Sequence, residues 1–433
     1  MIGAFEVMIG FLVMLGMMAV GIHVAVAIFT VATLGTLIYL STPLLFSFGD
    51  TLWGTLNDFI LTAIPLFILL GELLLRSGIT ERMYSALSIW LDRLPGGLLH
   101  TNIGASSVFA AMSGSSVATA ATIGTVALPA FAERGYSERL ALGTLAAGAT
   151  LGILIPPSIN MIIYGAITNT SIGKLFIAGI LPGLALAGAF MLTIMAFALL
   201  RPGVVGKASE RASLRERLAS LVDLLPPAFV FAIVIGSIYS GWATPTEAAA
   251  LGVVAALGLA AWNRKLTFRM LHECFLSMAR TTAMIMLIIV AAFFLNYVVG
   301  ILGIPTTLTR WVADLGLTPF GLILALVVFY LVLGCFLETL SMMIATVPIV
   351  VPMVVQFGFD PVWFGIFLVV MMEISLITPP IGMNLYVVQG VRGRGSITDV
   401  MVGSLPFLAI MLLFVLLIIL WPGLVLWLPE AMG

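Results

Sequence analysis

Two pairs of consecutive prolines, Pro156-Pro157 and Pro379-Pro380, interrupt long uncharged stretches of this chain. Residues 152–166 read GILIPPSINMIIYGA, and residues 376–388 read LITPPIGMNLYVV. Adjacent prolines remove two backbone donors and clash with the preceding turn, so each segment is predicted to form two half-helices joined by unwound backbone. The free carbonyls at such a break suit a small hard cation, and the free N–H groups of the second half-helix suit a carboxylate.

Two short polar stretches have the composition expected at the tips of re-entrant hairpins. One is Ser113-Gly114-Ser115-Ser116, near the middle of the uncharged residues 96–131, and the other is Glu338-Thr339-Leu340-Ser341, within residues 319–354. Oxygen donors without a dense carboxylate cluster favour a monovalent ion over a divalent one. The alternative is that the glycines and serines only allow close helix packing. Neutral hydroxyl ligands are expected from Ser115, Ser116, Ser158, Thr339 and Thr378.

Two acidic residues, Glu338 and Glu373, are predicted to lie within the membrane region of the second half. Carboxylates are costly at that depth and are usually functional. Glu373 comes six residues before Pro379, so it either neutralises a cation or ties the break to a neighbouring element. Thr244-Pro245-Thr246-Glu247 has a structural explanation instead, because Thr244 suits an N-cap and Glu247 would close a capping box.

The composition is that of a membrane protein. Of the 433 residues, 62% are hydrophobic and 9% are charged, and the mean hydropathy is +1.23, which predicts an all-α polytopic membrane protein. The net charge of −1 excludes a nucleic-acid-binding footprint. The three histidines are scattered, and HExxH, GxSxG and P-loop patterns are absent, so we expect neither an enzyme nor ATP hydrolysis by this chain. The N-terminus has no basic n-region, so the first hydrophobic run is expected to be a retained span.

About ten spans, two re-entrant hairpins and two broken helices are expected to position these groups. The hairpins are residues 96–131 and 319–354, and the broken helices, each counted as one span, are residues 138–169 and 361–391. Amphipathic interfacial pieces are expected at residues 41–57 and 79–94. The remaining spans are predicted near residues 4–20, 24–40, 58–76, 176–200, 226–240, 245–262, 281–300 and 400–421.

The second half of the chain repeats the first. The proline pairs, Pro129 with Pro352, and Ser171 with Ser396 match at offsets of 223 to 225 residues, which indicates duplication. We therefore expect a first repeat at residues 1–200, a cytoplasmic linker at 201–223 and a second repeat at 224–433. Each half has five crossings, and a hairpin adds none or two. The odd count would insert the second repeat upside down, which is the inverted-repeat plan of secondary transporters.

The distribution of basic residues predicts the orientation. If the N-terminus is outside, every lysine and arginine except Lys174 and Arg310 falls in an inner loop. The positive-inside rule therefore places both termini on the periplasmic side. The first hairpin then enters from the cytoplasm and the second from the outer face.

Four motifs, in order along the chain, resemble the large membrane subunit of tripartite ATP-independent periplasmic (TRAP) transporters. They are SGSSVATAATIGTVALPAFAERGYS (113–137), LGILIPPSINMIIYG…SIGKLFIAGILPG (151–183), GWATPTEAAALGV (241–253) and FDPVWFGIFLVVMMEISLITPPIGMNLYV (359–387). The resemblance implies sodium-coupled uptake of an organic acid across the bacterial inner membrane, with Na⁺ as coupling ion and no covalently bound cofactor. It leaves the substrate open among C4-dicarboxylates, sialic acid, keto acids and other carboxylates.

The same resemblance implies two partners and an elevator mechanism. The partners are a small membrane subunit of about four spans and a periplasmic substrate-binding protein. In the elevator, the hairpins and broken helices slide against a scaffold, and sodium binds where each hairpin tip meets a break. Two residues depart from the family pattern: Ser375 replaces an expected glycine, and Asn160 stands at a position that is usually apolar or proline.

Carried over motif by motif, the resemblance implies two ion sites and a substrate site. The ion ligands are expected among Ser113, Gly114, Ser115, Ser116, Gly152, Pro156, Glu338, Thr339, Ser341, Pro379 and Gly382. The substrate contacts are expected among Ser158, Asn160, Thr378 and Asn384. The alternative function is a stand-alone carrier of the same inverted-repeat type, which would take a dicarboxylate or other anion with sodium or protons. A membrane-embedded enzyme or an assembly scaffold is the alternative from a different class.

Overall fold

The computed structural model describes residues 3–40, 43–201, 203, 205–206 and 212–432, and within these ranges it is helical and contains no strand. The first half contains α1 (Ala4–Ala19), α2 (Val24–Tyr39), α3 (Pro43–Leu56), η1 (Phe59–Thr62), α4 (Ala63–Arg76), α5 (Ile79–Leu91), α6 (Leu98–Ser113), α7 (Ser116–Glu133), α8 (Glu138–Thr150), η2 (Leu151–Ile153), α9 (Ile159–Thr168) and α10 (Ile172–Leu200). The second half contains α11 (Leu214–Tyr239), α12 (Pro245–Trp262), α13 (Phe268–Ile301), α14 (Ile304–Asp314), α15 (Pro319–Gly334), α16 (Thr339–Gln356), α17 (Pro361–Ile377), α18 (Met383–Arg392), α19 (Ile397–Leu420) and α20 (Gly423–Met432).

The length and composition of the helices confirm the all-α polytopic fold class. Within the described part of the chain, eight helices are long and apolar enough to cross a bilayer, with η1 and α4 counted as one. The bent pair α14–α15 would make a ninth span if counted as one, and α1, α2, α9, α17 and α20 are shorter apolar helices. Both predicted hairpins are present as helix pairs, α6–α7 and α15–α16, and both predicted breaks separate two helices, α8 from α9 and α17 from α18.

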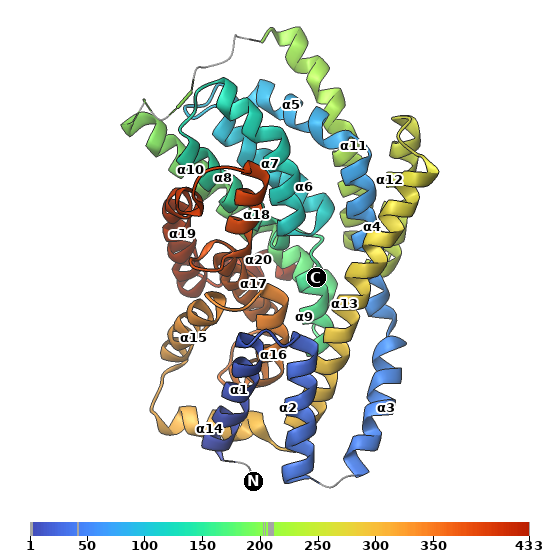
Figure 1. Cartoon of the computed structure of the whole chain (residues 1–433), viewed down its shortest axis with the longest axis vertical. Coiled ribbons are helices and arrows are strands. Elements are labelled where there is room, and N and C mark those ends of the chain that lie inside the picture. The colour runs from blue at the N-terminus through green and yellow to red at the C-terminus, as the bar shows by residue number, and fades with distance from the viewer. Residues whose placement is uncertain (1–2, 41–42, 202, 204, 207–211, 433) are drawn as a thin grey trace.

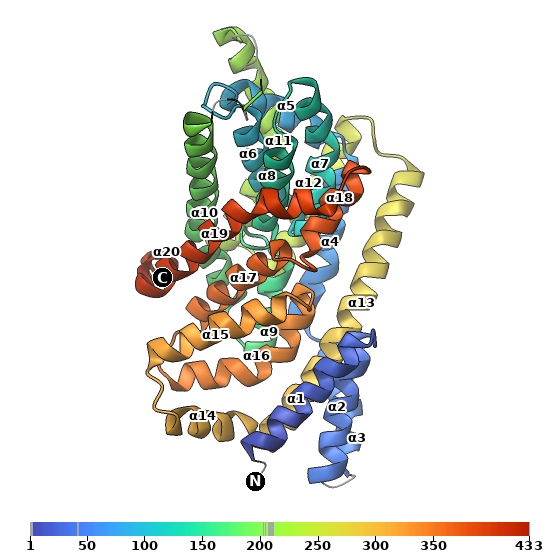
Figure 2. The same cartoon turned by 60° about the vertical axis from the view of Figure 1, so that its left-hand side comes forward.

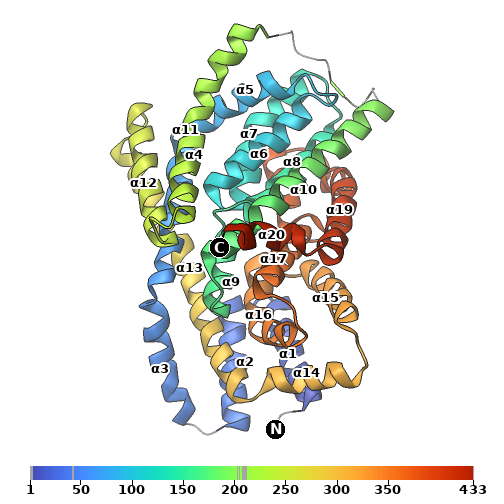
Figure 3. The same cartoon turned by 180° about the vertical axis from the view of Figure 1, so that it is seen from behind.

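Three elements differ from the sequence-based expectation. The segment 41–57, expected as an interfacial piece, contains α3, which lies lengthwise beside α13 (Figures 1 and 3). Helices α14 and α20 were not predicted, because α14 is short and charged and α20 follows the last span almost directly. Residues 41–42 and residues 202, 204 and 207–211 of the predicted linker lie outside the described residues, and α11 begins inside that linker.

The helix bounds recur at the offsets of the sequence repeat. Helix α16 begins 223 residues after α7, and each has 18 residues. Helix α18 begins 224 residues after α9, and each has 10 residues. Helices α5 and α14 both follow a glycine in the left-handed region, Gly78 (φ 76°) and Gly303 (φ 66°), a conformation that costs glycine nothing. The inverted relation of the two halves stays a prediction.

The hairpins and broken helices lie between two outer groups of helices. In Figure 1, α10 and α19 are on the left and α4, α12 and α13 on the right, and Figure 3 shows the same arrangement from behind. The hairpin α6–α7 occupies the upper half of the molecule and α15–α16 the lower half, close to the N-terminus. In Figure 2, α13 stands on the opposite side from α10, α19 and α20. The two predicted tips therefore approach the middle of the protein from different ends.

Candidate functional site

The tip of the first hairpin is a tight turn held by its own hydroxyls. Helix α6 ends at Ser113, and Gly114 takes a left-handed conformation (φ 61°). Ser115 is the N-cap of α7, and its Oγ accepts a hydrogen bond from the Ala118 N–H at 3.3 Å. The Thr119 hydroxyl donates to the Ser115 carbonyl at 2.8 Å and lies 3.2 Å from Ser113 Oγ. The tip residues therefore present a compact group of hydroxyl and carbonyl oxygens.

This tip lies directly against the first proline break. The Ser116 hydroxyl donates to the Thr150 carbonyl at 3.2 Å, where α8 ends. A Cβ added to Gly152 would lie 2.8 Å from the Ser116 nitrogen, and a Cβ added to Gly114 would lie 2.8 Å from the Pro157 carbonyl oxygen. The structure thus brings Ser113, Gly114, Ser115 and Ser116 together with Gly152 and its neighbours.

The first break is completely enclosed. All residues from Thr150 to Asn160, including Pro156, are buried. The Pro156-Pro157 peptide bond is cis. After it, Ser158 caps α9, and its Oγ accepts from the Met161 N–H at 3.5 Å. The second half-helix therefore begins with a side-chain cap, and its first turn points its N–H groups into the protein interior.

The second tip is built differently, around a carboxylate. Glu338 is the N-cap of α16, and its Oε1 accepts from the Leu340 N–H at 3.2 Å. Its Oε2 accepts from the Ser341 hydroxyl at 3.0 Å. A carboxylate at this position stabilises the positive end of a helix dipole. The structure therefore assigns Glu338 a capping role, and Thr339 follows it as the first residue of α16.

The second break is more open than the first. The Thr378 hydroxyl donates to the Ile374 carbonyl at 2.7 Å, and the Pro379-Pro380 bond is cis. A Cβ on Gly382 would lie 2.7 Å from the Leu376 carbonyl oxygen, so the unwound chain folds back on α17. Ile381 is 46% exposed and Met383 40% exposed. The two breaks therefore match in sequence but differ in their access to solvent or lipid.

The second tip does not meet the second break as closely as its counterpart does. Among the described residues, no hydrogen bond joins the tip residues 338–341 to the break residues 378–384. The hairpin instead approaches α17 just before the break, because a Cβ on Gly334 would lie 2.5 Å from that of Ser375. Ser375, which departs from the family pattern, thus packs against a glycine and donates its hydroxyl to the Met372 carbonyl at 2.6 Å.

Two asparagines link the broken helices of the two halves. Asn160 is the second residue of α9, and its Nδ2 lies 3.7 Å from the sulfur of Met372 on α17. Asn384 is the second residue of α18, and its Nδ2 donates to the Ala146 carbonyl of α8 at 3.2 Å. Asn384 Oδ1 is buried and has no partner among the described residues. Each second half-helix is therefore joined to the first half-helix of the other break. Sequence reasoning missed these links, although the equivalent positions of the two asparagines were a signal.

Glu373 is completely buried in α17. Neither carboxylate oxygen has a hydrogen-bond partner within the described part of the chain. Of the two alternatives that the sequence left open, the tie to a neighbouring element therefore has no supporting contact. A buried charge needs a compensating partner, and the other alternative is that Glu373 neutralises a cation.

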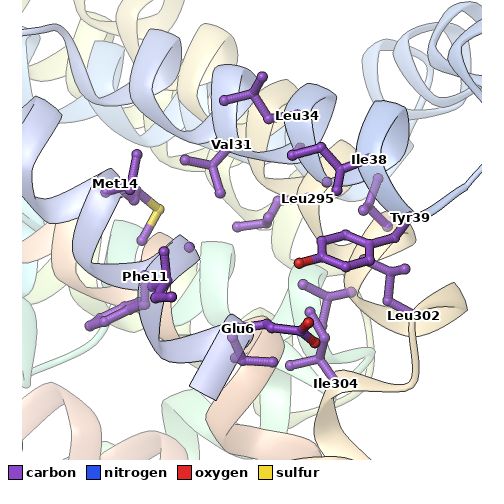
Figure 4. Close-up of a pocket in the computed structure, with 18 of the residues that line it drawn as sticks. Glu6, Phe11, Met14, Val31, Leu34, Ile38, Tyr39, Leu295, Leu302 and Ile304 are labelled. Carbon is purple, nitrogen blue, oxygen red and sulfur yellow. The ribbon is translucent and has the colours of Figure 1, made fainter. Parts of the chain in front are cut away.

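A cavity near the N-terminus is separate from these groups. It has a volume of about 210 Å³, lies between α1, α2 and α13, and is lined almost entirely by apolar side chains (Figure 4). Its polar exceptions are Glu6 and Tyr39, and Glu6 already accepts a hydrogen bond from the Gly3 N–H at 2.7 Å. None of the predicted site residues lines it.

The chain matches the family model "Tripartite ATP-independent periplasmic transporter, DctM component" over residues 11–424. It is 37% identical over 388 residues to the C4-dicarboxylate TRAP transporter large permease protein DctM of Pseudomonas aeruginosa, covering 89% of this chain and 90% of that protein. It is 34% identical to the sialic acid TRAP transporter large permease protein SiaM of Vibrio cholerae, covering 96% of each. It is 33% identical to the isethionate TRAP transporter permease protein DctMQ of Oleidesulfovibrio alaskensis, covering 92% of this chain and 62% of that protein.

Solved structures of other transporters share the fold. The YdaH transporter of Alcanivorax borkumensis superposes with a TM-score of 0.62 at 17% identity, covering 89% of this chain and 90% of that one. MtrF of Neisseria gonorrhoeae superposes with a TM-score of 0.55 at 13% identity, covering 87% and 83%. At these identities the likeness concerns the fold alone.

Proposed function

The chain belongs to the DctM component family of tripartite ATP-independent periplasmic transporters, and from this premise we propose that it carries an organic acid into the cell in symport with sodium. It is a multi-pass inner-membrane permease subunit and not an enzyme. The observation that carries the coupling proposal is the contact of the first hairpin tip with the first break, where Ser116 Oγ and the Thr150 carbonyl lie 3.2 Å apart.

The proposed sodium sites use the oxygens that the tips and breaks supply. At the first site, Ser113, Ser115 and Ser116 supply hydroxyls at the tip. The backbone of Ser115 and Ser116 packs against Gly152, and the Ser116 hydroxyl reaches the Thr150 carbonyl. These are neutral, hard donors, which suit a monovalent cation. At the second site, the break between Thr378 and Gly382 supplies carbonyls, and Glu373 on α17 supplies the compensating charge. The second tip, residues 338–341, would complete this site when the hairpin moves toward the break.

The proposed substrate site uses the N-terminal ends of α9 and α18. Helix N-termini favour anions, and the named substrates of the relatives, a C4-dicarboxylate, sialic acid and isethionate, are all acids. Ser158, Asn160, Thr378 and Asn384 lie at these ends or at the break before them. The buried, unpartnered Oδ1 of Asn384 would be available to a hydroxyl or ammonium group of the substrate.

We also propose two partners, an orientation and an elevator movement. The family implies a small membrane subunit and a periplasmic binding protein that delivers the acid. The relatives DctMQ and SiaT extend beyond the part that this chain matches, which covers 62% and 69% of their lengths. Both termini would face the periplasm, because the inner loops then hold nearly all basic residues. The hairpins and broken helices would move together against the helices around α13.

Reconstitution tests the proposal. Proteoliposomes that contain this chain and its small subunit, supplied with binding protein and radiolabelled acid, are expected to accumulate substrate only under an inward sodium gradient. The control replaces sodium by potassium at equal ionic strength. Uptake without sodium would overturn the coupling. Uptake without the binding protein would favour the stand-alone carrier.

Replacing the buried carboxylate by an amide is expected to weaken sodium binding. Glu373→Gln keeps the shape of the side chain but removes the charge, so the sodium concentration for half-maximal uptake should rise at least about tenfold, which corresponds to ~1.4 kcal/mol. The measurement is uptake against sodium concentration in proteoliposomes. The matched control is Glu247→Gln at the capping box of α12, where sodium dependence should not change. An unchanged sodium curve in Glu373→Gln would exclude Glu373 as the counter-charge.

A further inference from the structure

A groove lies between α5, α11 and α12, away from the hairpin tips and the breaks. It encloses about 670 Å³, and none of the candidate site residues lines it. Each of the three helices contributes residues at helical spacing. The apolar part of the lining consists mainly of Ile79 from α5, Val222, Leu225 and Phe229 from α11, and Leu259 and Trp262 from α12.

The groove is elongated, and its apolar walls are open. Helices α11 and α12 run antiparallel, because only the short connection 240–244 separates them. Val222 and Trp262 therefore lie toward the same end, and Phe229 lies about 10 Å further along α11 at 1.5 Å per residue. Leu225 is 62% exposed, and Trp262 is 87% exposed. Bare apolar side chains along this length suit a hydrocarbon chain.

One end of the groove is basic. Arg82 lines it, and its Nη1 donates to Asn263 Oδ1 at 3.5 Å. Lys265 does not line the groove itself, but its Cε would lie 3.7 Å from a Cβ on Gly78, the residue before Ile79 of the lining. Asp223 is the acidic residue of the lining. Within the described ranges, none of these three charged groups takes part in an ion pair. Neither cation is therefore neutralised by a carboxylate within these ranges.

We propose that this groove binds phosphatidylglycerol as a specific lipid. An acyl chain would lie along Leu225 and Phe229, and the phosphate would lie between Arg82 and Lys265. The headgroup glycerol hydroxyls would donate to the Asp223 carboxylate. Two cations against one carboxylate give the site a net positive charge, which favours anionic phosphatidylglycerol over zwitterionic phosphatidylcholine. Basic pockets between transmembrane helices are a recurrent form of anionic-lipid site. Trp262, exposed beside the basic end, suits the headgroup level of the bilayer.

Native mass spectrometry of the delipidated full-length chain tests the site. Phosphatidylglycerol is expected to bind more tightly than phosphatidylcholine. Arg82→Gln and Lys265→Gln should each weaken phosphatidylglycerol about fivefold, and Leu225→Trp should weaken it by filling the groove. The controls are Arg310→Gln on α14 and Val254→Trp on the exposed face of α12, which should bind as the unaltered chain does. Equal binding of the two lipids, or no change in either charge variant, would overturn the proposal.

A photo-crosslinker at position 225 in native membranes separates a lipid from a protein occupant. Adducts with phospholipid support the proposal. Adducts with the small subunit would show that a protein surface covers the groove, which would overturn it. Neither experiment requires transport, so the lipid site can fail while the proposed symport stands, and the reverse also holds.

Discussion

Replacing Gly152 with alanine is expected to lower the initial rate of sodium-driven uptake at least about tenfold. The added Cβ would lie 2.8 Å from the carbonyl carbon of Ser115 and the nitrogen of Ser116. Both atoms are backbone, so no side-chain rotation can relieve the contact. The hairpin tip must move away from the break, and inserting a methyl group into such packing costs about 1–3 kcal/mol. If sodium binds between the tip and the break, that displacement removes its ligands.

The matched control is a glycine without neighbours. Gly188 lies inside α10, and a Cβ there would meet nothing within 4 Å. Gly188→Ala should therefore transport normally and gain about 0.5–1 kcal/mol of helix stability. Uptake rates per reconstituted protein, compared at saturating sodium, distinguish the two variants. Full transport by Gly152→Ala would show that the close contact of tip and break is not required.

The features that could be predicted from the sequence are those with local causes. The proline pairs directly forbid continuous helix, so the breaks after Thr150 and Ile377 follow from covalent geometry. Thr244 and Glu247 form the predicted capping box, in which the Thr244 N–H donates to Glu247 Oε2 at 2.8 Å. The uncharged run at 96–131 divides at the small polar residues of its tip, as expected. In each case a few neighbouring residues determine the outcome.

Features that depend on distant contacts could not be predicted in the same way. The composition of residues 41–57 suits a membrane surface, and only the position of α13 explains why α3 lies alongside it. The difference between the two breaks also depends on distant contacts. The first tip contacts its break through Ser115 and Ser116, whereas no hydrogen bond among the described residues joins residues 338–341 to the second break. The Asn384–Ala146 hydrogen bond spans 238 residues of sequence.

The ion pairs at one end of α18 also could not be predicted from the sequence. From the sequence, Arg392 is predicted only to be one of many cations in the inner loops. In the structure its side chain is 6% exposed and forms ion pairs with Glu138 at 2.9 Å and Asp399 at 3.2 Å. Arg139 joins the same group through Asp399 at 2.9 Å. Charges from which the sequence predicts an orientation therefore also join the two halves of the chain, and only the tertiary structure reveals these ion pairs.

The crossing of α8 and α19 is expected to be the most sensitive packing contact of the protein. A Cβ on Gly143 would collide with the carbonyl oxygen of Gly403, and a Cβ on Gly403 would collide with the carbonyl oxygen of Arg139. Gly143→Ala should therefore lower the midpoint of thermal unfolding in detergent, by a destabilisation of about 1–3 kcal/mol or more. Gly258→Ala on α12, which meets nothing within 4 Å, is the control and should unfold at the original midpoint or above it. An unchanged midpoint in Gly143→Ala would contradict the close crossing.

A double substitution tests whether the two glycines form one contact. Once Gly143→Ala has pushed α19 away from α8, a methyl group at Gly403 meets less resistance. The loss of stability in the double variant should therefore be smaller than the sum of the two single losses, by about 0.5–3 kcal/mol. The same displacement would move the backbone of α8 that carries Ala146, the acceptor for Asn384. Uptake should thus fall with stability in all three variants, because the crossing fixes α8, whose Ala146 carbonyl accepts the hydrogen bond from Asn384 of α18.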